Sequence, residues 1–197
     1  AVSATDTNNA RPGELIWSHN TSGAIASTPV VSTSGSHAIY IGSFDKMFYA
    51  LDLKGNLLWQ QPFEASNWFW NTAVIHNDVI YVGSMDGNLY AIEALTGKSI
   101  WPSPFTTGGP IVSSPAIVES NIVIGSDDGT VYLVDANTGR EIRSFTTKDK
   151  VRADLTAENS KVYISGTDHI VRSADLKDGF WIELWCYNTK KQSNNCE

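Results

Sequence analysis

The stretch Glu14-Leu15-Ile16-Trp17 returns 42 residues later as Asn56-Leu57-Leu58-Trp59 and again as Lys98-Ser99-Ile100-Trp101. A fourth copy, Arg140-Glu141-Ile142-Arg143, keeps the interval but carries Arg in place of Trp. A second motif keeps step with the first, as Ile39-Tyr40-Ile41-Gly42-Ser43, Ile80-Tyr81-Val82-Gly83-Ser84 and Ile122-Val123-Ile124-Gly125-Ser126. Four copies in register predict a repeat protein with a unit of about 42 residues.

Each unit reads as four short strands, because its apolar runs are β-branched or aromatic and end at Gly, Asp, Asn or Ser. Asp86-Gly87 and Asp128-Gly129 are favoured two-residue hairpin turns between the second and third strands. A four-stranded unit of this length is typical of a propeller blade. We therefore expect an all-β β-propeller with antiparallel blades at 14–55, 56–97, 98–139 and 140–187. A flexible segment, 1–13, precedes the blades, and a tail, 188–197, follows them.

Composition narrows the function classes. The chain has 197 residues, 42% of them apolar, with 21 acidic and 14 basic residues and a net charge of −7. This charge argues against general nucleic-acid binding, which needs Lys and Arg to neutralise phosphates. No apolar run is long enough for a membrane-spanning helix. The chain opens on small and polar residues without Met, which is typical of a processed, exported protein, so we expect an extracellular or periplasmic location. Cys186 and Cys196 could form a disulfide or remain free thiols.

The pattern Glu93-x-x-Thr96-Gly97-x-x-x-Trp101 resembles the pyrroloquinoline-quinone-like repeat, as does Asp135-x-x-Thr138-Gly139. The resemblance covers roughly residues 14–186 and includes the BamB-like family. It implies a propeller of seven or eight blades in which the recurring Trp docks between neighbouring blades. It also implies a non-catalytic protein-interaction scaffold more readily than an enzyme, because most members bind no quinone. The fourth unit departs from the pattern at Arg143 and at Arg172, so we expect its blade to be looser than the others or to face a different neighbour.

The strands do not divide evenly into blades. Residues 14–18 predict an outer strand, and four sets of three inner strands follow, each with its own outer strand, the last near 181–187. One outer strand is therefore in excess. Three arrangements remain open at this stage: two chains forming one eight-bladed ring, a small propeller closed by one chain, or a fragment of a longer protein. An open fragment would expose strand edges that invite pairing with another chain.

The segments 26–29, 70–73, 112–115 and 152–155 correspond to the innermost strands, which line the channel in such folds. Most of their Ser and Thr residues predict strand-edge hydrogen bonds. One unit departs from the repeat at Asn67-Trp68-Phe69-Trp70. Trp68 and Trp70 alternate onto one side of an extended chain, where their indoles could stack on a ligand or partner, or else fill the blade interface. With Asn71, Arg152 and Asp154 they are the candidate binding residues. Arg152 and Asp154 could pair with each other or bind an anion.

The recurring carboxylates Asp45, Asp86, Asp128 and Asp168 occupy the same hairpin turn of successive units and predict turn stabilisation, not a metal site. The four histidines share no ligand spacing. A quinoprotein dehydrogenase would need adjacent cysteines, which the sequence lacks. We therefore expect no cofactor, no metal and no enzymatic activity. We expect a protein partner, and a homodimer that completes a larger propeller is one possibility. Carbohydrate or small-molecule binding is the alternative function, and a quinoprotein fragment is the third.

Overall fold

The computed structural model describes residues 3–4, 11–33, 35, 37–176 and 182–196. Within these ranges the regular elements are β-strands, and sixteen of them form four antiparallel sheets of four strands, blades 1 to 4. Blade 1 consists of β3 (Val30–Val31), β4 (Ala38–Gly42), β5 (Met47–Asp52) and β6 (Phe63–Glu64). Blade 2 consists of β7 (Val74–His76), β8 (Val79–Gly83), β9 (Asn88–Glu93) and β10 (Phe105–Thr106). Blade 3 consists of β11 (Ala116–Val118), β12 (Asn121–Gly125), β13 (Thr130–Asp135) and β14 (Glu141–Thr146). Blade 4 consists of β15 (Thr156–Glu158), β16 (Lys161–Ser165), β17 (Ile170–Asp175) and β18 (Ile182–Asn188).

Strands within a blade follow the order of the chain, so each blade is an up-and-down sheet. The expected all-β fold and four-stranded antiparallel blades are confirmed. The excess outer strand is also present: β2 (Trp17–Ser18) pairs with β1 (Ser3–Ala4) and joins no blade. Most of the segment expected to be flexible, 1–13, lies outside the described residues. No helix long and apolar enough to cross a membrane occurs in the described part of the chain.

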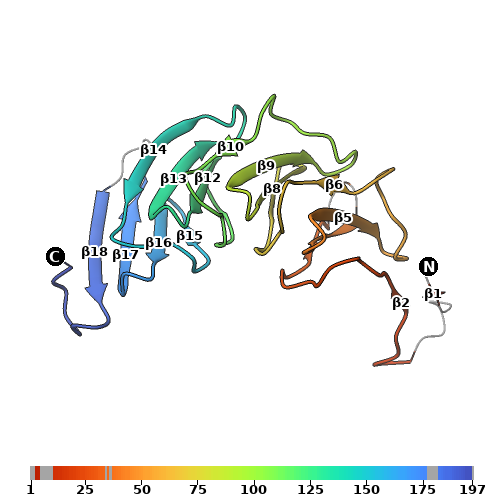
Figure 1. Ribbon diagram of the computed structural model, residues 1–197, viewed down its shortest axis with the longest axis horizontal. Coiled ribbons are helices and arrows are strands. Elements are labelled where there is room, and N and C mark those ends of the chain that lie inside the picture. Colours follow the sequence, from red (N-terminus) through yellow and green to blue (C-terminus); the bar gives the residue numbers. More distant parts are fainter. Residues whose placement is uncertain (1–2, 5–10, 34, 36, 177–181, 197) are drawn as a thin grey trace.

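The four blades stand side by side along an open arc (Figure 1). Outer strands β10 and β14 follow the convex side, and β15 lies toward the concave side. The two ends of the chain lie at opposite ends of the arc, and blade 4 does not close onto blade 1. The described chain therefore forms an open arc of four blades and not a small propeller closed on itself.

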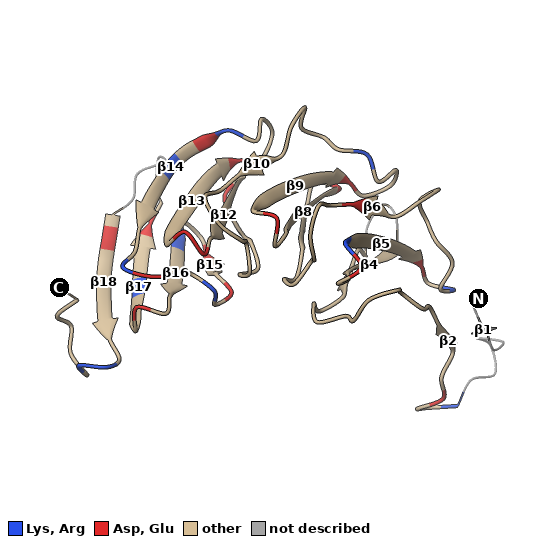
Figure 2. Ribbon diagram, viewed as in Figure 1, with Lys and Arg blue, Asp and Glu red and all other residues tan. Residues whose placement is uncertain are grey.

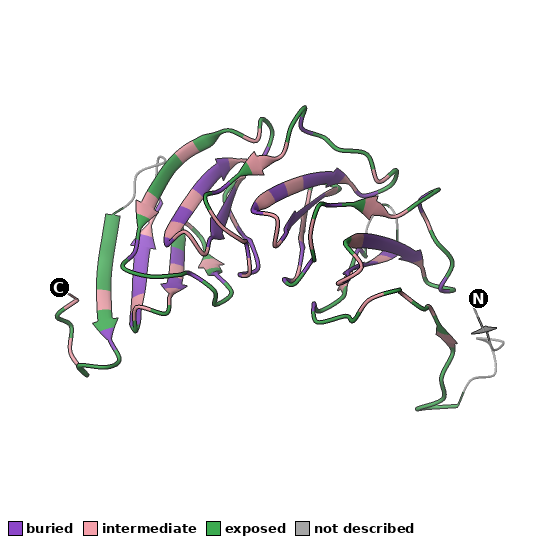
Figure 3. Ribbon diagram, viewed as in Figure 1, coloured by how far each residue is buried: buried purple, intermediate pink, exposed green. Residues whose placement is uncertain are grey.

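The hydrophobic core is divided into layers, one between each pair of neighbouring blades. Tyr40 and Phe48 of blade 1 share a cluster with Ile80 and Ile92 of blade 2. Equivalent clusters join blade 2 to blade 3 and blade 3 to blade 4. The middle strands are accordingly buried, whereas β18 at the end of the arc is largely exposed (Figure 3).

The recurring tryptophan docks in two of these layers, as Trp59 between blades 1 and 2 and as Trp101 between blades 2 and 3. The Trp59 indole donates to the Ala94 carbonyl of the next blade at 2.9 Å, and only 3% of its surface is exposed. Its ring covers Gly97, where a Cβ would lie 2.6 Å from the indole and where φ is +74°. Glycine is required at this position both by the positive φ and by the close approach of the ring. The docking role that the family resemblance implied for this Trp is therefore confirmed.

The C-terminal tail is held against blade 4. Cys186 and Cys196 form a disulfide, which settles the alternative that the sequence left open. The backbone adds a hydrogen bond from the Asn188 N–H to the Ser193 carbonyl. The described part of the tail therefore folds back on the end of β18.

We predict that Trp59→Ala lowers the free energy of unfolding by roughly 3–5 kcal/mol, because it empties a buried site between two blades. Urea denaturation followed by circular dichroism would measure the change. Trp68→Ala is the matched control, since Trp68 remains 42% exposed and should cost clearly less. Equal losses in the two variants would contradict the role assigned to Trp59.

Candidate functional site

One rim of the arc carries the residues that depart from the repeat. It is built from the turn between the second and third strands of each blade and from the loop that leads into each innermost strand. Backbone hydrogen bonds fix turn to loop: the Met85 N–H donates to the Trp68 carbonyl at 2.9 Å, and the Asp127 N–H donates to the Pro110 carbonyl at 2.9 Å. Because this scaffold repeats, side chains at equivalent rim positions can be compared between junctions.

At the junction of blades 1 and 2 the rim holds an aromatic cluster, formed by Phe44, Trp68 and Trp70. The Phe44 ring stacks on Trp68 with centroids 4.9 Å apart and on Trp70 with centroids 5.0 Å apart. Phe69, between the two tryptophans, points into the core and is fully buried. The alternation expected from the sequence thus places both indoles on one side, where they remain 42% and 43% exposed.

At the junction of blades 3 and 4 the same positions hold an ionic cluster, formed by Asp127, Lys150 and Arg152. The Arg152 guanidinium donates to both Asp127 oxygens, from Nε at 2.8 Å and from Nη2 at 2.6 Å. The Lys150 ammonium lies 3.7 Å from the same carboxylate. This Arg152 hydrogen bond lowers the pKa of the Asp127 carboxyl below its ordinary value. The partner of Arg152 is therefore Asp127, and the expected pair with Asp154 is not formed.

The remaining candidate residues tie blades together. Asn71 is buried and donates from Nδ2 to the Gly83 carbonyl at 3.1 Å and to the Ile111 carbonyl at 3.0 Å. Asp154 accepts a hydrogen bond from the Ser114 N–H at 2.8 Å, just as Ser114 Oγ accepts one from the Thr72 N–H at 3.0 Å. These Ser and Thr positions make hydrogen bonds as expected, but from loops rather than strand edges, and the bonds cross from blade to blade.

These bonds also explain why the innermost strands begin later than predicted. The Thr72 and Ser114 N–H groups bond side chains of the next blade instead of a strand within their own sheet. The segments expected as innermost strands are therefore loops that immediately precede β3, β7, β11 and β15.

The recurring turn aspartates organise their own hairpins. Asp86 accepts a 2.7 Å hydrogen bond from the Tyr90 hydroxyl, and Asp128 accepts one of 2.7 Å from Tyr132. Burial and the bond to Asp128 raise the pKa of Tyr132 to about 12. Figure 2 shows acidic residues at turns and strand ends along the arc. No group of three metal-ligating side chains gathers anywhere in the described ranges.

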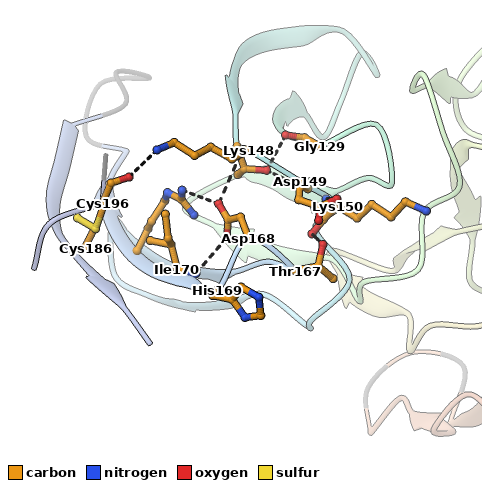
Figure 4. Close-up of polar contacts among 12 residues, drawn as sticks. Gly129, Lys148, Asp149, Lys150, Thr167, Asp168, His169, Ile170, Cys186 and Cys196 are labelled. Carbon is orange, nitrogen blue, oxygen red and sulfur yellow. Dashed lines mark hydrogen bonds and ion pairs between the residues drawn. A yellow bond between two sulfur atoms is a disulfide. The ribbon is translucent and has the colours of Figure 1, made fainter. Parts of the chain in front are cut away.

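Blade 4 replaces the hairpin tyrosine by Arg172. Its guanidinium donates to Asp168 at 2.6 Å, and only 5% of the residue is exposed. Figure 4 shows Asp168 also accepting from the Lys148 and Ile170 N–H groups, and the Lys148 ammonium donating to the Cys196 carbonyl. A cavity of about 620 Å³ adjoins this network, lined by Phe145, Arg172, Glu183 and the disulfide among others. Arg172 thus performs the hairpin role of a tyrosine, next to a cavity at the blade 3–4 junction.

The structure keeps Trp68 and Trp70 together, with the buried Asn71 in the same loop, but places Arg152 and Asp154 at the junction of blades 3 and 4. Sequence reasoning missed Phe44, Asp127 and Lys150. Phe44 and Asp127 follow the recurring Gly-Ser pair in their units, where the second unit has Met85. The three units carry Phe, Met and Asp at this equivalent position, and that variation was the signal in the sequence that could have identified Phe44 and Asp127.

Comparisons with known proteins agree with this architecture. The family model of the outer membrane protein assembly factor BamB matches residues 6–107, 45–128 and 100–195. A comparison with curated protein sequences finds no match.

Among solved structures, BamB from Moraxella catarrhalis is similar, with a TM-score of 0.72 and 20% identity over 89% of this chain. The computationally designed proteins Ika8 and Ika4 each have a TM-score of 0.69 and 20% identity, over 80% and 79% of this chain. The alignments cover 57% of the BamB chain, 48% of Ika8 and 93% of Ika4. The chain thus spans about half the length of two of these structures, and at this identity the likeness shows the fold alone.

We predict that acid weakens the Asp127 contact. Its folded-state pKa lies below the ordinary 3.8, so the stabilisation is present above pH 4 and is lost as the pH falls through the folded value. Asp127→Asn should cost about 1 kcal/mol at pH 7 and less at pH 3, measured by urea unfolding. Glu158→Gln, at an exposed carboxylate of β15, is the control. A cost of Asp127→Asn that does not change with pH would contradict the prediction.

Proposed function

Because the chain belongs to the family of the outer membrane protein assembly factor BamB, we propose that it is a non-catalytic module that binds a protein partner through its rim. The observation that carries the proposal is the aromatic cluster, in which two tryptophans remain almost half exposed. Trp is enriched among the residues that dominate the energy of protein interfaces.

The cluster is preorganised for binding. Phe44 stacks between the two indoles, and the Met85–Trp68 backbone bond fixes the loop that carries them. A partner that covers these rings gains apolar burial and loses little side-chain freedom, because the rings are already ordered. Among the junctions that the structure describes, the cluster occurs at one, whereas a packing role would be expected to repeat.

An exported location is part of this proposal. The disulfide between Cys186 and Cys196 supports it, because disulfides persist in oxidising compartments such as the periplasm and the exterior. We place the module in the periplasm or outside the cell.

Carbohydrate binding is the second candidate. Exposed tryptophans that share one side of a loop can stack on the apolar face of a sugar ring, and Trp68 and Trp70 are arranged in this way. A quinoprotein fragment fits less well, because the two cysteines of the sequence are ten residues apart and close a loop at the end of blade 4.

We further propose that two copies of the chain complete one ring. The open arc holds four blades, and the chain spans 57% of BamB and 48% of Ika8. Two such arcs together supply eight blades, which lies within the seven or eight that the family resemblance implies.

We predict that the double variant Trp68→Ala/Trp70→Ala loses its protein partner. Affinity capture from envelope extract of the source cells, with quantitative mass spectrometry, would compare it with the parent and with Leu95→Ala, another exposed apolar residue. Recovery of the partner should fall about tenfold or more in the double variant alone.

Two outcomes would contradict this prediction. Equal recovery by the double variant would remove the aromatic cluster from the interface. A saturable change in tryptophan emission on adding soluble cello- or chito-oligosaccharides, absent in the double variant, would favour carbohydrate binding instead.

A further inference from the structure

The docking position of the recurring tryptophan occurs five times, at Trp17, Trp59, Trp101, Arg143 and Trp185. The chain has four blades to receive it. Trp59 and Trp101 dock on the blade that follows, donating to Ala94 and Ala136 at 2.9 and 3.0 Å. Within the described residues, one of these five positions therefore has no blade to dock on.

Trp17 fills the first slot. Its indole donates to the Leu53 carbonyl at 3.0 Å, and a Cβ on Gly55 would lie 2.7 Å from its ring. Leu53 and Gly55 thus receive Trp17 as Ala94 and Gly97 receive Trp59. The slot on blade 1 is occupied by the N-terminal segment of the same chain.

Trp185 occupies no such slot in the described part of the chain. It lies on β18, the outer strand of blade 4, where it pairs with Ser173 and remains 48% exposed, against 3% for Trp59. Its ring is 6.5 Å from that of Tyr163, and in blade 1 the corresponding Tyr40 and Trp59 rings are 5.9 Å apart. Blade 4 therefore presents the same Tyr–Trp pair that blade 1 uses to hold its neighbour.

The surface around Trp185 is hollow. A groove of about 440 Å³ is lined by Val171, Trp185, Tyr187 and Asn194, together with Cys186. Val171 and Tyr187 are paired across the sheet, as are Phe48 and Phe63 in the interface between blades 1 and 2. In blade 1 the equivalent face is covered by the glycine turn and the carbonyl of blade 2, so the repeat indicates that another blade covers the face around Trp185.

We infer that this face binds blade 1 of a second copy of the chain, with Trp185 entering the Leu53–Gly55 slot in place of the partner's Trp17. The inference rests on the proposal that two copies share a ring, and it names the contact that joins them. Two identical head-to-tail junctions related by a two-fold axis close such a ring.

The resident Trp17 can be displaced because its segment is short and exposed to solvent. Its strand, β2, is two residues long, and the preceding Leu15 and Ile16 are exposed. Exchange of equivalent elements between copies is a low-cost route to a dimer. Trp17 belongs to the same chain as its slot, so it competes with the partner's Trp185 at a high effective concentration. Because of this competition, the fraction of dimer is expected to depend on protein concentration.

Trp17 is therefore expected to oppose dimerisation, and Trp185 is expected to favour it. Sedimentation velocity and light scattering over a range of concentrations would give the dimer dissociation constant of the parent, Trp17→Ala, Trp185→Ala and Leu95→Ala. Trp17→Ala should tighten dimerisation and Trp185→Ala should weaken it, each by about tenfold or more. Leu95→Ala, on an exposed turn of blade 2, should match the parent.

Trp185→Arg provides a second variant. The chain itself carries Arg at the equivalent position 143 and forms the blade there, so this substitution is compatible with the fold. It should weaken dimerisation as Trp185→Ala does, with an unchanged circular dichroism spectrum.

The possible failures can be told apart. If neither the parent nor Trp17→Ala exceeds the mass of one chain at any concentration, both the shared ring and this contact are wrong. If a dimer forms with the same dissociation constant in Trp185→Ala and Trp185→Arg, a shared ring can stand but the Trp185 contact is wrong. If Trp17→Ala does not tighten a dimer that depends on Trp185, exchange at the Leu53–Gly55 slot is wrong.

Discussion

The contact between an indole and a glycine turn of the next blade is the interaction on which the rest of the structure depends. A blade of four short strands has little core of its own, and its apolar faces are buried only by its neighbours. Trp59 bridges two blades by packing on Gly97 and bonding the Ala94 carbonyl. Each tryptophan thus sets both the distance and the orientation between adjacent sheets, and with them the geometry of the rim.

That fixed geometry lets the rim vary without loss of the fold. Equivalent positions hold Phe44, Trp68 and Trp70 at one junction and Asp127, Lys150 and Arg152 at another. The same backbone hydrogen bonds support both clusters. Because the scaffold is constant, the difference between an exposed aromatic surface and a paired ionic one reflects side chains alone, which is how a repeat protein can acquire a local binding site.

The sequence was sufficient for the blades, their hairpins and the docking tryptophans, since each of these depends on residues that recur at a fixed interval. Trp68 and Trp70 could be placed on one side of the chain by strand alternation alone. The contact of these tryptophans with Phe44 could not be predicted from the sequence, because it joins the turn of one blade to the loop that enters the next. The partner of Arg152 was missed for the same reason: Asp127 lies 25 residues away, on the preceding blade, and neither alternative from the sequence included it. Contacts between blades depend on how the sheets pack, and local patterns do not encode that packing.

An open arc has two terminal blades, and the outer face of each lacks the neighbouring blade that would bury it in a closed ring. At blade 1, the N-terminal segment supplies Trp17 to the slot that another blade would fill. At blade 4, the outward face keeps Tyr163 and Trp185 but adds Glu158 and Lys161 at positions where blade 3 has Val118 and Asn121. One end is thus covered from within the chain, and the other keeps the docking pair in a more polar setting. This asymmetry suits a reversible contact better than a permanent one, because the exposed face remains compatible with water when no second blade covers it.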